Sequence, residues 1–290
     1  MAHGTNIRTW FDGEWHEGNP AILRAADFGA WLGNLVFDGA RMAKGAVPDL
    51  DRHCQRLVAS AAAMDMNPSV DAEAIAALTL EGLKAYAPDA AVYIRPMMWS
   101  AEPDAGVISC DPDSTLFALC LEEVPLPAEG ASTTLTRTRF RRPTLDCAVV
   151  NAKAACLYPN NARMIREARA KGFGNALVAD ALGNVAETAS SNVFMVRDGV
   201  VMTPMPNGTF LAGITRARHI ALLREAGYEV VETTLTFADF EAADEVFLTG
   251  NMAKTTPVTA LDDVTYQAGP VARRMGALYW EWARDAAAAA

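Results

Sequence analysis

The run NAKAACLYPNN at residues 151–161 places one lysine, Lys153, among small and mostly uncharged residues. Most lysines are solvated surface charges whose stems lie across apolar neighbours, and this position by itself fits that description. If Lys153 were buried, desolvation would lower the pKa of its amine and favour the neutral form. Because only a neutral amine attacks a carbonyl carbon, the segment is also a candidate for Schiff-base chemistry.

A carboxylate in a second segment could serve a ring-shaped cofactor. Glu187 lies in NVAETASSNVF, where the residues that follow it are small enough for a flat ring to approach. A carboxylate that faces a pyridine nitrogen would keep that nitrogen protonated and make the ring an electron sink. On position alone, Glu187 could equally be an ordinary surface acid.

Three other places could bind a phosphate. Ile214 and Thr215 begin a predicted helix, whose first N–H groups and dipole favour an anion. Asn251 lies in a loop of small residues directly after the apolar stretch EVFL, and Arg56 could add a bidentate guanidinium contact. Each of these indications is weak alone, because helices often begin after glycine and helix arginines are common.

The elements that must position these residues are strands and helices without strict βαβ alternation, so the sequence predicts an α+β (mixed α/β) fold. Asp49 precedes apolar residues at helical spacing and is expected to cap the helix that follows. The expected strands and hairpin turns lie at 7–15, 91–99, 114–124, 180–184 and 198–199, and the expected helices at 50–64, 71–86, 159–172, 214–227 and 269–290.

A domain boundary is best placed at residues 124–132, where VPLPAEGAS brings two prolines and a glycine close together. We therefore expect a smaller N-terminal α/β domain at 1–122, a linker at 123–132 and a larger C-terminal domain at 133–290.

Composition limits the class of partner. The 290 residues include 35 acids and 25 Lys and Arg, and the net charge of −10 opposes binding to nucleic acids and anionic membranes. The chain start lacks a basic segment followed by an apolar one, and no run of about 18 apolar residues occurs, so we expect a cytoplasmic protein with small-molecule substrates. The five cysteines are scattered and form no CxxC pair, which predicts reduced, buried thiols and no metal site.

Together these segments resemble the signature of the class IV, fold type IV aminotransferases. ETASSNVF at 187–194, VMT at 201–203 and LAGITR at 211–216 meet every constrained position of that signature. LVFDGAR, DRHCQRL, YIRP, NAKAACLY and EVFLTGNMAKTTPV are similar to branched-chain aminotransferase segments and occur in the same order. The resemblance therefore spans nearly the whole chain.

The resemblance implies a homodimeric transaminase that depends on pyridoxal 5′-phosphate (PLP), with two domains and the cofactor in the cleft between them. It implies that Lys153 binds the cofactor aldehyde and carries a proton during the reaction. Glu187 would pair with the pyridine nitrogen, and Tyr158 would donate a hydrogen bond to the ring oxygen. The residues that the resemblance assigns to the phosphate are Arg56, Ile214, Thr215, Asn251 and Met252.

Tyr93 and Arg95 match the branched-chain form, and the residues that the resemblance places near the substrate are Leu32, Phe37, Tyr93 and Arg95. A cationic Arg95 suits a substrate carboxylate. The expected reaction is transfer of an amino group from a branched-chain L-amino acid to a 2-oxo acid such as 2-oxoglutarate. Leu32 stands where branched-chain members carry tyrosine, which leaves open an (R)-amine or D-amino acid transaminase. An aminodeoxychorismate lyase and a non-catalytic binding protein are the remaining alternatives.

Overall fold

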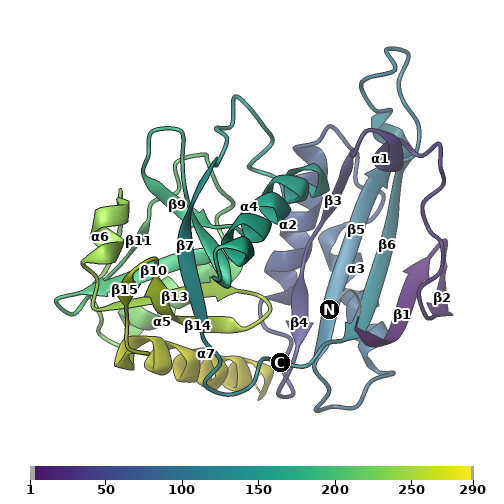
Figure 1. Cartoon of the computed structure of the whole chain (residues 1–290). Coiled ribbons are helices and arrows are strands. Elements are labelled where there is room, and N and C mark those ends of the chain that lie inside the picture. The colour runs from purple at the N-terminus through teal and green to yellow at the C-terminus, as the bar shows by residue number, and fades with distance from the viewer. Residues whose placement is uncertain (1–3, 289–290) are drawn as a thin grey trace. The chain divides into compact units, whose positions relative to one another are not determined.

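Residues 4–288 are described by the computed structural model of the chain, and they divide into two units. The first unit comprises 4–126, 151–157 and 283–288, and the second comprises 127–150 and 158–282 (Figure 1). Each unit contains its own sheet. Lys153 therefore belongs to the first unit, although the sequence on both sides of its segment belongs to the second.

The sheet of the first unit is antiparallel, with the strand order β2-β1-β6-β5-β3 and with β4 also paired to β5. Asp12 and Gly13 form the tight turn between its first two strands, both with positive φ. The strands are β1 (Thr5–Phe11), β2 (Glu14–Glu17), β3 (Leu35–Phe37), β4 (Ala40–Met42), β5 (Val92–Ser100) and β6 (Thr115–Glu123).

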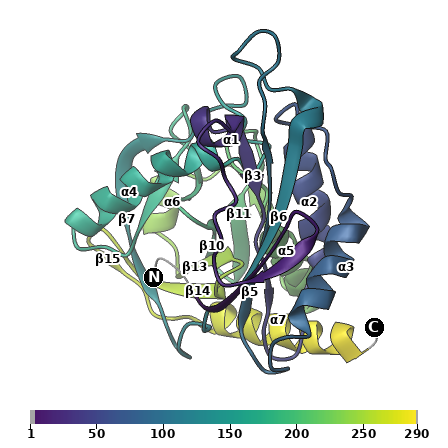
Figure 2. The same ribbon diagram turned by 90° about the vertical axis from the view of Figure 1, so that its right-hand side faces the viewer.

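The two faces of this sheet differ in what they carry. Because side chains alternate along a strand, β5 directs Ile94 toward one face and both Tyr93 and Arg95 toward the other. Ile94 lies in a hydrophobic core with residues of the helices α2 (Leu50–Ala62) and α3 (Ala72–Leu83), which run along the same side of the sheet (Figure 2). The residues expected to bind substrate are thus on the face opposite these helices.

The start of α2 differs from the expectation. Asp49 precedes the helix with a φ of 55°, and its side chain makes no capping hydrogen bond. It lies instead 3.9 Å from the Arg52 guanidinium, so the prediction that Asp49 caps this helix is wrong. At α3, by contrast, the Asp71 carboxylate accepts a hydrogen bond from the Ala74 N–H at 2.8 Å. The first unit also contains α1 (Phe28–Trp31), η1 (Pro112–Ser114) and η2 (Ala155–Leu157).

The sheet of the second unit has the order β12-β11-β10-β13-β14-β7-β8-β9, with β15 on β14, and it mixes parallel and antiparallel pairs. Its strands are β7 (Thr133–Arg141), β8 (Asn175–Ala179), β9 (Val185–Thr188), β10 (Asn192–Arg197), β11 (Val200–Pro204), β12 (Val230–Thr233), β13 (Glu245–Gly250), β14 (Lys254–Leu261) and β15 (Val264–Thr265). Its helices are α4 (Tyr158–Ala170), α5 (Ile214–Glu225), α6 (Phe237–Glu241) and most of α7 (Pro270–Ala288). The predicted α+β fold is confirmed.

The two expected hairpins of this unit are present. Gly183 lies in the turn that joins β8 to β9, with a φ of 95°. Asp198 and Gly199 join β10 to β11 with φ values of 51° and 79°, the left-handed pair that a two-residue hairpin requires. These turns place Glu187 on β9, directly opposite Val178 of β8.

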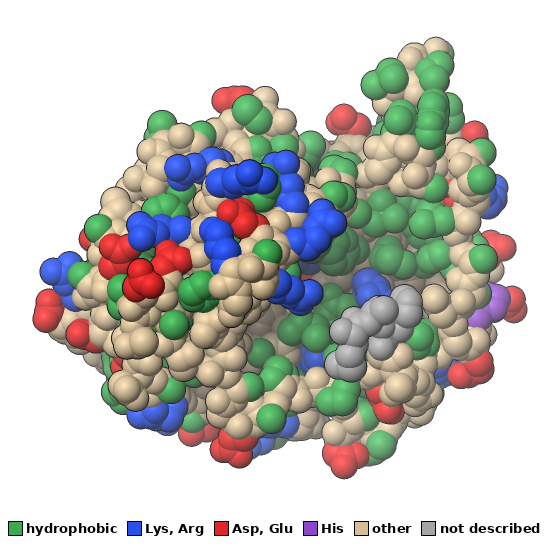
Figure 3. All heavy atoms as spheres, in the orientation of Figure 1, with side chains coloured by type: hydrophobic (Ala, Val, Ile, Leu, Met, Phe, Trp, Pro, Cys, Tyr) green, Lys and Arg blue, Asp and Glu red, His purple; other side chains and the backbone are tan. Residues whose placement is uncertain are grey.

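Charge is unevenly spread over the second unit. Helix α4 packs along β7 and β8, and basic side chains gather over α4 and β7 (Figure 3). The exposed basic residues of β7 and α4, with the one that follows α4, are Arg137, Arg139, Arg141, Arg163, Arg166, Arg169 and Lys171. The net charge of −10 therefore coexists with a locally cationic surface.

All five cysteines lie within residues 4–288 and are free thiols. Cys54, Cys110 and Cys120 are buried, whereas Cys147 and Cys156 are exposed, so the expectation that every thiol is buried is wrong for those two. Among the helices that the structure describes, none is long and apolar enough to cross a membrane.

Candidate active site

The segment that carries Lys153 is attached to the edge strand β3 and to α2. The Phe37 N–H donates to the Lys153 carbonyl oxygen at 3.2 Å, and Ala154 forms an antiparallel bridge with Val36. The Lys153 N–H donates to the Oγ of the buried Ser60 at 3.0 Å. Two elements thus fix the lysine backbone, and its Nζ lies 5.0 Å from the centre of the Phe37 ring.

The structure brings the expected substrate residues together on this sheet face. Phe37 pairs with Met97 in register, so both lie on the face that also carries Tyr93 and Arg95 of the same strand. The Arg95 guanidinium carbon lies 5.6 Å from the centre of the Tyr93 ring. Lys153, Phe37, Tyr93 and Arg95 therefore form one group within the first unit. Leu32 follows α1 and is 43% exposed.

Arg56 is held by a buried carboxylate that the sequence did not single out. Arg56 donates to Asp38 through Nε at 2.7 Å and through Nη2 at 2.9 Å, which is a bidentate pair. His53 Nδ1 lies 2.7 Å from Oδ1 of the same carboxylate, and the Gly39 N–H donates to it at 2.7 Å. Burial would raise the pKa of Asp38, but Arg56 and His53 outweigh it and hold that pKa well below its usual range.

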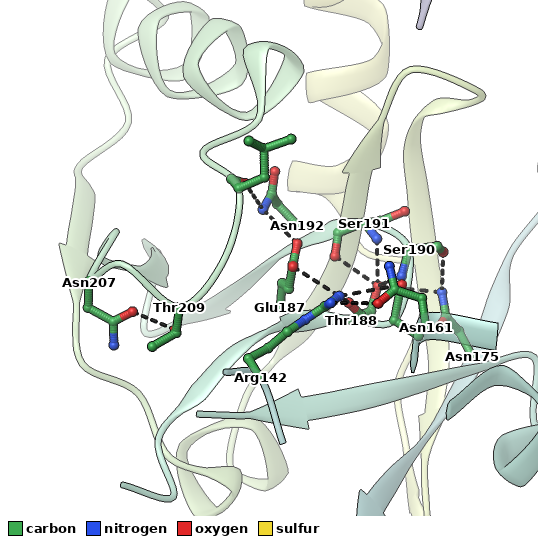
Figure 4. A network of polar contacts seen from close by, with 12 residues as sticks. Arg142, Asn161, Asn175, Glu187, Thr188, Ser190, Ser191, Asn192, Asn207 and Thr209 are labelled. Atoms are coloured by element: carbon green, nitrogen blue, oxygen red, sulfur yellow. Dashed lines mark hydrogen bonds and ion pairs between the residues drawn. The ribbon is translucent and has the colours of Figure 1, made fainter. Parts of the chain in front are cut away.

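Glu187 lies in a polar network of the second unit (Figure 4). Its Oε1 pairs with Arg142 Nη2 at 2.9 Å, and its Oε2 accepts from Asn192 Nδ2 at 3.2 Å. Arg142 also donates to Asn161 Oδ1 of α4 at 2.7 Å and to the Thr188 carbonyl at 2.9 Å. Glu187 is 9% exposed and Arg142 is 8% exposed, so the pair is largely withdrawn from solvent.

Asn192 connects Glu187 to the start of α5. Its Nδ2 also donates to the Leu211 carbonyl at 3.2 Å, two residues before Gly213, which occupies the N-cap position of the helix. A side chain at Gly213 would collide with the amide oxygen of Asn192, so glycine is required there. The carboxylate and the helix start are therefore held together through one amide side chain.

A second connection joins α5 to the loop that contains Asn251. His219, one turn into α5, has its Nε2 2.8 Å from the Thr255 hydroxyl. Lys254, which is 1% exposed, donates from Nζ to Asn251 Oδ1 at 2.6 Å. The helix start with Ile214 and the Asn251 loop are thus fixed to each other within the second unit.

The other predicted residues of the second unit are described by their place in the chain and their exposure. Tyr158 is the first residue of α4 and is 39% exposed, and Met252 is 47% exposed. Thr215 is the second residue of α5, and its side chain is buried. Sequence reasoning missed Asp38, Arg142 and Asn192. Asp38 and Asn192 lie inside the quoted segments LVFDGAR and ETASSNVF, but nothing in the sequence indicates their partners.

His219 should make folding stability depend on pH. Burial, reinforced by the nearby Lys254 charge, lowers the pKa of His219 from 6.5 to about 3. The unfolded chain then binds this proton below pH 6.5 while the folded chain does not, so stability falls as the pH falls through this window. Between pH 7 and pH 5 the free energy of unfolding should fall by about 2 kcal/mol less in His219→Asn than in the wild type. Urea unfolding at the two pH values measures this difference. Equal pH slopes for the two proteins would contradict this assignment.

Comparison with known proteins identifies the family of the chain. A family model described as amino-transferase class IV matches residues 35–261. A crystal structure of an aminotransferase from Brucella abortus, bound to PLP, is 58% identical and covers 96% of this chain and 99% of its own, with a TM-score of 0.94. A branched-chain aminotransferase from Thermoproteus uzoniensis, solved with norvaline, is 28% identical and covers 94% and 93%, with a TM-score of 0.86. The branched-chain-amino-acid aminotransferase of Pseudomonas aeruginosa is 28% identical over 282 residues, which are 94% of this chain and 91% of that protein. Because the family match extends over most of the sequence, this chain belongs to the class IV aminotransferases.

Proposed function

We propose that this aminotransferase uses PLP to move an amino group from a branched-chain L-amino acid to a 2-oxo acid. The observation that carries the proposal is the position of the Lys153 amine over the Phe37 ring, on the sheet face that also carries Tyr93 and Arg95. The PLP in the Brucella abortus relative supports the cofactor. The branched-chain aminotransferases among the relatives support the donor class.

The residues present fit this cofactor. Gly213 holds the N-cap position of α5 without a side-chain capping hydrogen bond, directly before the N–H groups of Ile214 and Thr215. Unpaired N–H groups at a helix start suit a phosphate. Arg56, oriented by Asp38, would add a guanidinium contact to that phosphate. Asn251 and Met252, in the loop that is fixed to α5, would complete the phosphate-binding residues.

When bound, PLP supplies an aldehyde for covalent attachment and a pyridine ring that accepts an electron pair. Lys153 would hold the aldehyde carbon until the donor replaces it, and would then move a proton between the donor Cα and that carbon. Glu187 would keep a proton on the pyridine nitrogen, because a carboxylate can accept this bond in addition to those from Arg142 and Asn192. Tyr158 would donate to the ring oxygen.

We further propose a cytoplasmic homodimer that has small molecules as substrates and neither nucleic acid nor membrane as partner. The net charge of −10 supports the last point, since it opposes association with polyanions. Light scattering of the purified protein tests the dimer directly, and a monomeric mass in active preparations would contradict it.

The proposed function is tested by the half-reaction of the purified, yellow holoenzyme with single amino donors. We expect L-leucine and L-valine to discharge the absorption band of the lysine-bound cofactor. The comparison donors are D-alanine and both enantiomers of 1-phenylethylamine. If only D-alanine or one amine discharges the band, the D-amino acid or (R)-amine alternative suggested by Leu32 is correct. Release of pyruvate from aminodeoxychorismate without amino transfer would indicate a lyase.

Asp38 is expected to control cofactor affinity through Arg56. In Asp38→Asn the bidentate pair with Arg56 loses its charge, so the guanidinium is held less firmly toward the phosphate. By analogy with residues that orient metal ligands, we expect PLP to bind about 10- to 100-fold more weakly, measured by titration of the apoenzyme. Asp51→Asn, an exposed change on the same helix, is the control and should leave the affinity unchanged.

A further inference from the structure

Arg95 already has a carboxylate partner on the sheet face of the first unit. Its Nη2 lies 2.9 Å from Oε1 of Glu122, which is 4% exposed. The second oxygen of Glu122 accepts the Gly4 N–H at 2.6 Å. Arg41, which unlike Arg95 is fully buried, donates to the Val124 carbonyl at 2.8 Å. The charge of Arg95 is therefore balanced before any substrate arrives.

Register places this ion pair among the residues that we assign to the substrate. Glu122 of β6 lies directly opposite Tyr93 of β5, and Cys120 lies opposite Arg95, so all four share one face. Arg95 Nη2 also lies 3.4 Å from the Cys120 sulfur. This is the face on which the Phe37 ring meets the Lys153 amine. The carboxylate thus belongs to the same side-chain layer as the proposed covalent lysine.

We propose that Glu122 is a specificity-determining residue, which favours substrates with an apolar side chain over those whose side chain ends in a carboxylate. The inference rests on the proposed function and names the substrate class of that site. A guanidinium without a partner would attract a second carboxylate bidentately. With Glu122 in place, an incoming carboxylate must either lie beside a like charge or displace Glu122 and leave it buried without Arg95. Leucine is therefore favoured over glutamate as donor, and pyruvate over 2-oxoglutarate as acceptor.

The test compares two unreactive probes that differ in the second carboxylate. Glutarate corresponds to glutamate without its amino group, and 4-methylvalerate corresponds to leucine without it. We expect Glu122→Gln holoenzyme to bind glutarate about tenfold more tightly than the wild type, with 4-methylvalerate changed less than about twofold, both by calorimetry. The half-reaction rate with L-glutamate should rise relative to L-leucine by a similar factor. Glu123→Gln, next on the strand and on the opposite face, should change neither ratio.

Each outcome of this test decides the inference. An unchanged ratio of the two affinities in a folded Glu122→Gln variant would overturn it, and so would equal tightening of both probes, which would place the α-carboxylate on Arg95. If Glu122→Gln does not fold, Arg95→Gln serves instead. That variant should bind glutarate more weakly and change its affinity for 4-methylvalerate less. An equal loss of affinity for both probes would overturn the inference. Failure of the protein to take up PLP would contradict the proposed function. An active enzyme in which the ratio of the two probe affinities is unchanged would contradict only this inference.

Discussion

Replacing Lys153 with alanine should lower the rate of transamination by about 10³- to 10⁴-fold, because in the proposed function the same amine attaches the cofactor and moves the proton. Borohydride reduction should fix the cofactor to the wild-type chain and to Lys84→Ala, an exposed-lysine control, but not to Lys153→Ala. Mass spectrometry of the digested protein should locate the reduced cofactor on the peptide that contains Lys153.

The chain has five lysines, and Lys254 is the competing candidate because its side chain is only 1% exposed. The surroundings of the two amines differ. Both amines lie over an aromatic ring, Lys254 Nζ at 5.3 Å from the centre of Tyr279 and Lys153 Nζ at 5.0 Å from the centre of Phe37. Lys254 Nζ also donates to the Asn251 amide oxygen at 2.6 Å, whereas the ring below Lys153 lies on the sheet face that carries Arg95. Reduced cofactor on the Lys254 peptide would overturn the assignment of Lys153 and the proposed mechanism with it.

Local patterns predicted most of the elements but not the position of the Lys153 segment. The turn at Asp198 and Gly199 follows from residues that tolerate positive φ, and these are adjacent in the sequence. The hydrogen bond from Lys153 to Ser60 joins residues 93 positions apart. Helical and strand periodicity carries no information about such a partner, so residues 151–157 could not be assigned to the first unit from sequence.

The polar residues that support the site were missed for the same reason. Asp38 is recognisable only through Arg56, 18 positions later, and Arg142 only through contacts with the strand that carries Glu187. A buried ionic side chain is explained by its partner, and a single sequence does not indicate which partner folding will supply. Residues within the family signature, such as Glu187, could be named because the resemblance itself carries their roles.

Replacing Glu187 with glutamine should lower kcat with L-leucine by about 10²- to 10³-fold, a size typical of losing one electrostatic contact at a reacting centre. A neutral amide cannot hold the pyridine nitrogen protonated as a carboxylate does, so the ring accepts electrons less readily. Cofactor affinity should change much less, because the residues that we propose for the phosphate, in α5 and at Arg56, are unchanged. Steady-state kinetics and apoenzyme titration measure the two effects separately.

The fold should tolerate Glu187→Gln because Arg142 keeps its hydrogen bonds to Asn161 at 2.7 Å and to the Thr188 carbonyl at 2.9 Å. Glu167→Gln is the control, since Glu167 of α4 is half-buried and pairs at 3.1 Å with Lys171, the residue that follows the helix. If both variants lower kcat equally, the effect belongs to lost ion pairs and Glu187 has no role at the ring. A large loss of kcat in Glu187→Gln alone, with the cofactor still bound, is the result that only a contact between this carboxylate and the pyridine nitrogen explains.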